Sequence, residues 1–314
     1  MDDTPILVVA DDPATADAAA SALAAELPVD VATVHDDDGD ELLRRAPVLV
    51  TFDPPSVGFA AAEAVEWVHV ATAGVDGYPV ERLAGRGVVV TNGRGVNAEP
   101  VAEQALASML AFDRRIHRAV RQQHRREWSW FGGHELRGKT VGVVGVGAIG
   151  GLLATLCSRL GTHVLGVKRD TGERVDGVDE LFAPAELETV LARAEHLVLT
   201  CPLTDETRGL IDAGALHRLP DYAVVVNVAR GEVVDEDDLV TALEAGEIRG
   251  AALDVFAEEP LPESSPLWDR DDVILTPHMA GSTPAFWERN AELVADNYPK
   301  FRRGDTDGMR NRVV

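Results

Sequence analysis

The stretch Lys139–Gly161, KTVGVVGVGAIGGLLATLCSRLG, decides the fold of this chain. It starts with a β-branched apolar run, continues through the turn GVGAIG, and ends in an Ala- and Leu-rich segment of helical period. A strand, a G-x-G-x-x-G turn and a helix in this order predict a dinucleotide-binding unit, whereas a glycine-rich turn alone would be a weak signal. The glycines allow a tight turn, a close approach of backbone amides to a diphosphate, and close packing of the helix on the strand. The predicted coenzyme-binding turn comprises Gly145, Gly147, Ala148, Ile149 and Gly150.

The residues that follow the next strand bear on the choice of coenzyme. In THVLGVKRD, Lys168 and Arg169 stand where NAD-binding units carry an acidic residue for the ribose 2′-hydroxyl. Two cations suit a 2′-phosphate, which a carboxylate would repel. The sequence therefore favours NADP(H), with NAD(H) also used. The alternative is that both cations are solvated and that Asp170 turns back to the ribose.

Short β-branched runs alternate with Ala-rich helical segments on both sides of this stretch. Such alternation predicts parallel βαβ units, and two successive doubly wound α/β domains are the economical arrangement. Residues 97 to about 126 have a helical period throughout and are expected to form one long linking helix. A last helical segment is expected to return to the first domain. We therefore expect a substrate domain of residues 1–97 plus 284–314 and a dinucleotide-binding domain of residues 98–283.

Composition excludes several classes of protein. The 314 residues carry 29 Lys plus Arg against 53 Asp plus Glu, a formal net charge of −24, which argues against nucleic acid as a partner. No apolar run approaches the roughly 20 residues of a membrane helix, and the amino terminus has no signal-peptide pattern, so a cytoplasmic location is expected. The only cysteines, Cys157 and Cys201, argue against disulfides and a thiolate zinc site, and no metal site is predicted.

The basic residues are themselves unusual, because only three of them are lysines. Abundant Asp, scarce Lys and a large negative charge resemble the proteins of salt-loving archaea. An acidic mesophilic protein is the alternative. At 1 M salt the Debye length is only about 3 Å, so the self-repulsion of such a surface is nearly screened. We therefore expect a halophilic protein.

Three later segments place chemically active residues at strand ends. NVARGEVVDEDDL contains Arg230, LDVFAEEP contains Glu259, and LTPHMAGST contains His278. Ligands of open α/β folds bind at the carboxyl edge of the sheet, where these residues are expected to lie. Taken singly, each has a structural alternative: a hydrogen-bonding His, an Arg at a strand end and a surface Glu. Their ordered occurrence after a dinucleotide turn favours catalysis.

Together with the coenzyme turn, these segments resemble the NAD(P)-dependent D-2-hydroxyacid dehydrogenases. The motifs that carry the resemblance are R-G-x-x-V-D, the E-P after D-V-F, T-P-H, and the PLTDET run from Pro202 to Thr207. The resemblance implies a Rossmann coenzyme domain and a flavodoxin-like substrate domain, with the active site in the cleft between them. It also implies reversible reduction of 2-oxo acids to D-2-hydroxy acids. His278 would be the general acid/base, Glu259 its partner, and Arg230 the group that binds the substrate carboxylate and carbonyl.

The resemblance implies further contacts. The loop Ala73, Gly74 and Val75 matches the family's substrate-carboxylate loop, and Asp254 matches the residue that meets the nicotinamide carboxamide. The other residues expected along the coenzyme are Cys201, Pro202, Thr207, Val228, Ala229, His278 and Gly281.

The first domain supplies neutral candidates for the substrate pocket, namely Phe52, Trp287 and Tyr298, which favour an aliphatic 2-oxo acid. Trp128 and Trp130 are interpreted as core residues or as a contact in a homodimer. Two alternatives remain for the function. One is glyoxylate or hydroxypyruvate reduction by the same residues, and the other is a coenzyme-sensing interaction protein of the same fold.

Overall fold

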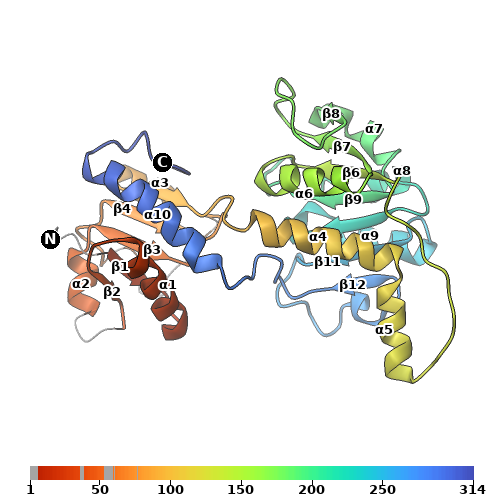
Figure 1. Ribbon diagram of the computed structural model, residues 1–314, viewed down its shortest axis with the longest axis horizontal. Coiled ribbons are helices and arrows are strands. Elements are labelled where there is room, and N and C mark those ends of the chain that lie inside the picture. Colours follow the sequence, from red (N-terminus) through yellow and green to blue (C-terminus); the bar gives the residue numbers. More distant parts are fainter. Residues whose placement is uncertain (1–5, 36–38, 53–58, 60, 76) are drawn as a thin grey trace. The chain divides into compact units, whose positions relative to one another are not determined.

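The computed structural model describes residues 6–35, 39–52, 59, 61–75 and 77–314 (Figure 1). The chain forms two compact units, Met1–Asn97 with Thr283–Val314, and Ala98–Ser282. Each unit has its own parallel sheet and its own core.

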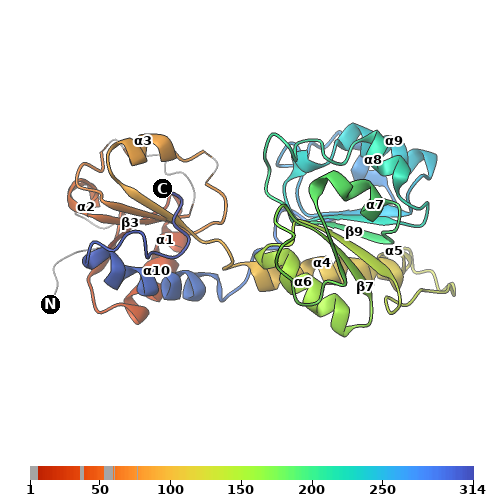
Figure 2. The same cartoon turned by 90° about the horizontal axis from the view of Figure 1, so that it is seen from above.

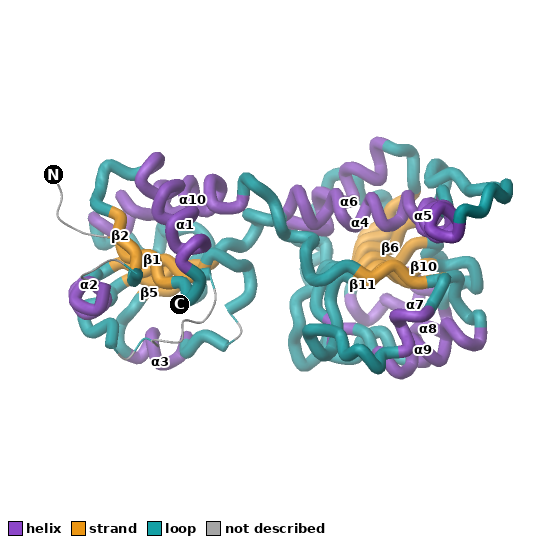
Figure 3. The backbone as a smooth tube through the Cα atoms, turned by 90° about the horizontal axis from the view of Figure 1, so that it is seen from below, coloured by secondary structure: helices purple, strands orange, loops and turns teal. Residues whose placement is uncertain are grey.

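The first unit has a five-stranded sheet in the order β2-β1-β3-β4-β5, which is the flavodoxin-like order. Helices α1 and α10 cover one face of this sheet, and α2 and α3 cover the other (Figures 2 and 3). Strand residues are buried on both faces, as expected for a sheet covered on two sides. The elements are β1 (Ile6–Val9), α1 (Pro13–Glu26), β2 (Val31–Thr33), α2 (Gly39–Arg45), β3 (Val48–Thr51), β4 (Trp67–Val70), α3 (Val80–Gly85), β5 (Val89–Asn92) and α10 (Phe286–Arg302).

The second unit has a seven-stranded parallel sheet in the order β12-β11-β10-β9-β6-β7-β8. Counted from β6, this is the Rossmann order with one added strand. Helices α4 and α6 lie on one face and α7, α8 and α9 on the other (Figures 2 and 3). The elements are α4 (Ala98–Asp113), α5 (Ile116–Arg125), β6 (Thr140–Val144), α6 (Ala148–Arg159), β7 (His163–Val167), β8 (Glu180–Phe182), α7 (Leu187–Leu191), β9 (His196–Leu199), α8 (Ala213–Arg218), β10 (Val224–Asn227), α9 (Glu236–Ala245), β11 (Gly250–Leu253) and β12 (Val273–Leu275). The predicted class of two doubly wound parallel sheets is confirmed.

The prediction of one continuous helix over residues 97–126 was wrong. α4 ends at Asp113, and α5 begins at Ile116 after Arg115, which has a left-handed backbone with φ of 53°. A residue in this region cannot continue a right-handed helix, so the chain turns there. The sequence does not reveal this break, because the residues on both sides of it are good helix formers and continue the helical pattern.

A buried ion cluster lies at the end of α4. The Asp113 carboxylate accepts hydrogen bonds from Nζ of Lys139 at 2.8 Å, Nη2 of Arg249 at 2.9 Å and Nε2 of His196 at 2.9 Å. Burial alone would raise the pKa of Asp113, but the bond from His196 and the two cations hold it well below its ordinary range. Burial lowers the pKa of His196 and so disfavours a charge on its imidazole. One side chain thus joins α4 to β9 and to the residues that precede β6 and β11.

Among the described residues, no helix combines the length and apolar character that crossing a bilayer requires.

Candidate functional site

The strands of the second sheet end in a single row. Val144 of β6 pairs with Val167 of β7 and Leu199 of β9, and the row continues through Asn227, Leu253 and Leu275. The residues after this row therefore meet at one carboxyl edge. Lys168, Gly145, Val228 and Asp254 each stand directly after it. The sheet register thus brings the ends of these six strands to one edge.

Two glycines of the turn after β6 are required by packing. Gly145 has a φ of 99°, and a Cβ added to it would lie 2.6 Å from Cα of Cys201. A Cβ on Gly150 would lie 2.4 Å from the carbonyl oxygen of Gly145 and 2.7 Å from Oγ1 of Thr200. Any larger residue at either position would push α6 away from β6 and β9.

Gly147 differs from these two glycines, because an added Cβ would meet nothing within 4 Å. Gly147 and Ala148 are exposed at the start of α6. The first N–H groups of an α-helix have no acceptor within the helix, so this end offers donors to an anion. An open cradle at a helix amino terminus fits the diphosphate of a dinucleotide coenzyme, as the sequence predicts.

The end of β7 presents the predicted coenzyme cations. Arg169 is exposed and Lys168 is half-buried, and neither forms an ion pair with any residue in the described ranges. The Asp170 carboxylate instead accepts a hydrogen bond from the N–H of Gly172 at 2.9 Å. Asp170 is thus engaged in a local turn, while Lys168 and Arg169 keep their charges unpaired.

The loop after β9 is held together by hydrogen bonds of the Thr207 side chain. The Thr207 hydroxyl donates to the carbonyl of Pro202 at 2.6 Å and accepts from the N–H of Thr204 at 2.7 Å. Cys201 is buried, and burial raises the pKa of its thiol to about 11, so it is not a thiolate at neutral pH. Pro202 is exposed on this loop. Thr207 therefore shapes the predicted coenzyme loop.

Arg230 is positioned by the residues before it. Asn227, 1% exposed, accepts from the N–H of Ala229 at 3.0 Å and donates to the carbonyl of Arg230 at 3.0 Å. The Arg230 guanidinium donates through Nη1 to the carbonyl of Ala229 at 2.7 Å. Val228 and Ala229 are buried. One nitrogen of Arg230 is thus used locally, and its other N–H groups remain for a ligand.

Gly231 joins the Arg230 loop to the Glu259 loop. An added Cβ would lie 1.9 Å from the backbone carbon of Phe256 and 2.3 Å from the backbone nitrogen of Ala257. The two loops therefore touch backbone to backbone, which only glycine permits. The N–H of Phe256 donates to Oε1 of Glu259 at 2.9 Å, so the same contact places the Glu259 carboxylate.

His278 and Glu259 form a pair at this edge. Nδ1 of His278 lies 2.7 Å from Oε2 of Glu259, and the imidazole is 53% exposed. The backbone of His278 has a φ of 48°, a left-handed conformation that costs a non-glycine residue of order 1–3 kcal/mol. The N–H of His278 donates to the carbonyl of Asp254 at 2.8 Å and holds it in this conformation. The pair can move a proton through Nε2, the nitrogen that Glu259 does not engage.

The Asp254 carboxylate holds the loop that carries His278. It is 3% exposed and accepts from the Thr276 hydroxyl at 2.5 Å, from the N–H of Met279 at 3.0 Å and from the N–H of Ala280 at 2.9 Å. Gly281 follows these residues and is half-buried. The structure thus gives Asp254 a positioning role. Its predicted contact with the nicotinamide carboxamide stays a prediction.

A mostly apolar cavity of about 610 Å³ adjoins the His278–Glu259 pair. Its walls include Phe256, Leu261, Trp268 and Leu275. An apolar wall beside a polar pair matches the character of small-molecule sites.

The first unit holds the predicted carboxylate loop. The carbonyl of Ala73 accepts from Asn92, that of Gly74 from the Thr72 hydroxyl, and that of Val75 from the N–H of Tyr78. Within the described chain, the N–H groups of Gly74 and Val75 donate no hydrogen bond. The loop is therefore fixed through its carbonyl groups and keeps these two donors free for an anion.

The predicted pocket aromatics of the first unit lie together, with one exception. Phe52 contacts Phe286 and Trp287 at centroid distances of 5.5 and 5.9 Å, and Phe52 and Trp287 are half-buried. Tyr298 is buried in the core formed with α1, so its assignment to the pocket was wrong. The helical period places Tyr298 on α10 but does not show which face packs on α1.

Sequence reasoning missed the residues that hold the site together, namely Asn227, Gly231 and Thr276. The signals were weak. An Asn that ends an apolar strand, and a Gly after Arg230, are both compatible with ordinary turns.

The chain is similar in sequence to known oxidoreductases. Residues 106–280 match the family model described as D-isomer specific 2-hydroxyacid dehydrogenase, NAD binding domain. A glyoxylate reductase of Korarchaeum cryptofilum is 36% identical over 256 residues, which cover 79% of this chain and 76% of that protein. A D-3-phosphoglycerate dehydrogenase of Archaeoglobus fulgidus is 35% identical over 277 residues, 84% of this chain but only 52% of that longer protein.

A solved structure gives the same picture. A D-isomer specific 2-hydroxyacid dehydrogenase from Xanthobacter autotrophicus, in complex with NADPH and MES, aligns with a TM-score of 0.83 and 32% identity. The alignment covers 100% of this chain and 98% of that one.

Proposed function

The chain belongs to the D-isomer specific 2-hydroxyacid dehydrogenases, and from this premise we propose that it reduces small aliphatic 2-oxo acids with NADPH as the preferred coenzyme. The family reaction is NAD(P)-dependent reduction of a 2-oxo acid to a 2-hydroxy acid. The observation that carries the proposal is the 2.7 Å contact of His278 with Glu259 at the sheet edge that holds the glycine turn.

Different residues of the chain have separate roles in the proposed reaction. The nicotinamide coenzyme supplies the hydride when bound. His278 gives a proton from Nε2 to the carbonyl oxygen of the substrate, while Glu259 on Nδ1 fixes the tautomer and orientation of the ring. Arg230 holds the substrate carboxylate with the N–H groups that Ala229 does not use. A carboxylate contact by the N–H groups of Gly74 and Val75 stays a prediction.

Turnover of a panel of 2-oxo acids tests this function. Pyruvate, glyoxylate, hydroxypyruvate and longer aliphatic 2-oxo acids are to be assayed with both coenzymes, and the expected result is NADPH oxidation that yields the D-2-hydroxy acid. A clear preference for glyoxylate or hydroxypyruvate would favour the alternative that the Korarchaeum cryptofilum relative suggests. Coenzyme binding without turnover of any 2-oxo acid would instead support a coenzyme-sensing protein.

The proposed preference for NADPH rests on Lys168 and Arg169. Replacing both by Gln removes two unpaired cations from the end of β7, where the 2′-phosphate of NADPH would lie. Each charge-assisted hydrogen bond of this kind contributes about 1.5–3 kcal/mol to the binding free energy when it is shielded from water, and less when it is exposed to solvent. The KM for NADPH is therefore expected to rise roughly ten- to hundred-fold.

The KM for NADH is the internal control for this variant, because NADH has no 2′-phosphate and its KM should change little. The pair Arg82→Gln and Arg159→Gln removes the same charge from exposed positions elsewhere. An unchanged ratio of the two KM values in the Lys168 and Arg169 variant would refute the preference.

A homodimer is also part of the proposal. α5 has no buried residue, and Trp128 and Trp130 after it are 103% and 90% exposed. Large aromatic side chains in full contact with water are typical of an interaction surface. We assign Trp128 and Trp130 to the contact with a second copy of the chain.

A further inference from the structure

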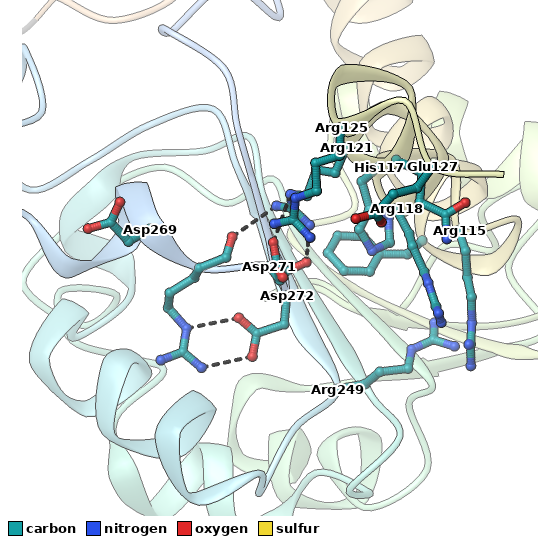
Figure 4. Close-up of a pocket in the computed structure, with 13 residues that line it drawn as sticks. Arg115, His117, Arg118, Arg121, Arg125, Glu127, Arg249, Asp269, Asp271 and Asp272 are labelled. Carbon is teal, nitrogen blue, oxygen red and sulfur yellow. Dashed lines mark hydrogen bonds and ion pairs between the residues drawn. The ribbon is translucent and has the colours of Figure 1, made fainter. Parts of the chain in front are cut away.

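A cavity of about 740 Å³ lies between α5 and the residues before β12 (Figure 4). Six arginines and four acidic residues line it, whereas the whole chain carries 29 basic against 53 acidic residues. The cavity therefore reverses the charge balance of the protein. An anion that approaches this acidic surface would be attracted only at such places.

Two of the arginines are structural. Arg121 donates to the carbonyl groups of Arg270 and Val273 at 2.9 and 3.1 Å and pairs with Asp271 at 3.1 Å. Arg270 binds both oxygens of Asp272, at 2.9 and 2.8 Å. These contacts attach α5 to the β12 edge and use the charges of two of the four acids.

The other arginines keep donors that no protein group uses. Over the ranges that the structure describes, Arg115, Arg118 and Arg125 make no ion pair, although Arg118 lies 4.7 Å from the ring centre of Phe131. Arg249 binds Asp113 through Nη2, but its buried Nε has no acceptor. Figure 4 shows Arg115 and Arg118 reaching down toward Arg249. Buried donors in proteins are normally satisfied, so this Nε requires an explanation.

A neighbouring histidine reports the positive potential of the cavity. His117 lines the cavity, and among the described residues its imidazole forms no hydrogen bond with an acidic side chain. Burial lowers the pKa of His117, and the charges of Arg121, Arg249 and Arg115 lower it further. The cations that line the cavity thus disfavour a charge on this ring.

We propose that this cavity binds a small multivalent oxyanion, one that carries phosphate or carboxylate groups, between Arg115, Arg118 and Arg249. The guanidinium fork matches the geometry of both groups and binds them bidentately. Such an anion would relieve the mutual repulsion of the three cations and give the buried Nε of Arg249 an acceptor. The cavity volume lies within the range of small-molecule sites. The proposal does not depend on the coenzyme or substrate assignments.

Calorimetric titration with pyrophosphate and with citrate tests this site in the full-length protein. Saturating NADPH is present to occupy the glycine turn, and KCl holds the ionic strength constant. The expected result is saturable binding of at least one probe. The Arg115→Gln, Arg118→Gln double variant is expected to bind it at least about tenfold more weakly, because two charge-assisted contacts are lost. The stronger of the two probes identifies phosphate or carboxylate as the preferred group.

Three further measurements make the result specific. The double variant Arg82→Gln, Arg159→Gln removes equal charge outside the cavity and should bind as the wild type does. The single variant Arg125→Gln is milder and should weaken binding to a smaller degree. In the wild type, the pKa of His117 measured by NMR should rise when the probe binds, because the anion offsets the nearby cations.

The proposal fails if neither probe binds, or if the Arg115 and Arg118 variant binds as tightly as the control variant. The competing explanation is that the arginines contact a second copy of the chain, and light scattering tests it through the molar mass. A change of molar mass in that variant, without loss of probe binding, would assign the arginines to a contact with a second copy and overturn the proposal.

Discussion

Replacing His278 by Ala is expected to lower kcat by about 10²- to 10⁴-fold, the usual contribution of a general acid or base. The Glu259 carboxylate stays in place through the N–H of Phe256, but no group can then deliver a proton through Nε2. The glycine turn lies on other strands of the sheet, so the Kd for NADPH should change little. Steady-state turnover and fluorescence titration of the coenzyme measure the two effects.

A second variant keeps this prediction falsifiable. His278 has a left-handed backbone, which Asn tolerates better than Ala, so His278→Asn separates loss of the proton donor from backbone strain. Both variants should lose turnover to a similar extent. Glu259→Gln should lower kcat less than loss of the imidazole and should alter the pH profile, since it changes the partner of Nδ1. Near-normal kcat in both His278 variants would refute the assignment.

Replacing Asp113 by Asn is expected to reduce the free energy of unfolding by about 3–5 kcal/mol, the effect of breaking a buried ion pair on one side. Lys139, Arg249 and His196 would lose their shared acceptor. For a unit of this size, the melting temperature should fall by roughly 6–20 °C. Urea unfolding and thermal unfolding measure the two quantities.

The pH dependence of this effect has a definite sign. The folded-state pKa of Asp113 is held below the value of about 3.9 in an unfolded chain, so the carboxylate contributes its full stabilisation above about pH 4. The contribution is lost as the pH falls toward the folded-state pKa. The difference between wild type and Asp113→Asn should therefore be larger at pH 7 than at pH 3.

The matched control is Asp221→Asn, which makes the same change at an exposed site without a side-chain partner in the described structure. Its unfolding free energy should stay within about 0.5 kcal/mol of the wild type. If Asp113→Asn were equally mild, the prediction that the buried cluster stabilises this unit would be refuted.

Much of the coenzyme half of the site could be predicted because its requirements are local. The turn from Gly145 to Gly150 must follow a strand and precede a helix, and the steric clashes at Gly145 and Gly150 explain why glycine stands there. The His278–Glu259 contact followed from resemblance, and its 2.7 Å geometry came from the fold. The halophilic character rests on composition alone and stays a prediction.

The sequence by itself determined the fold class, the parallel order of strands and helices, and the strand ends at which Arg230, Glu259 and His278 stand. Strand and helix periods and the glycine turn are properties of neighbouring residues, so the chain displays them directly. Only the tertiary structure decided that α4 breaks before Arg115, that Asp254 binds the His278 loop, and that Arg115 and Arg249 line one cavity. A carboxylate or a guanidinium can bind many partners, and long-range packing selects among them.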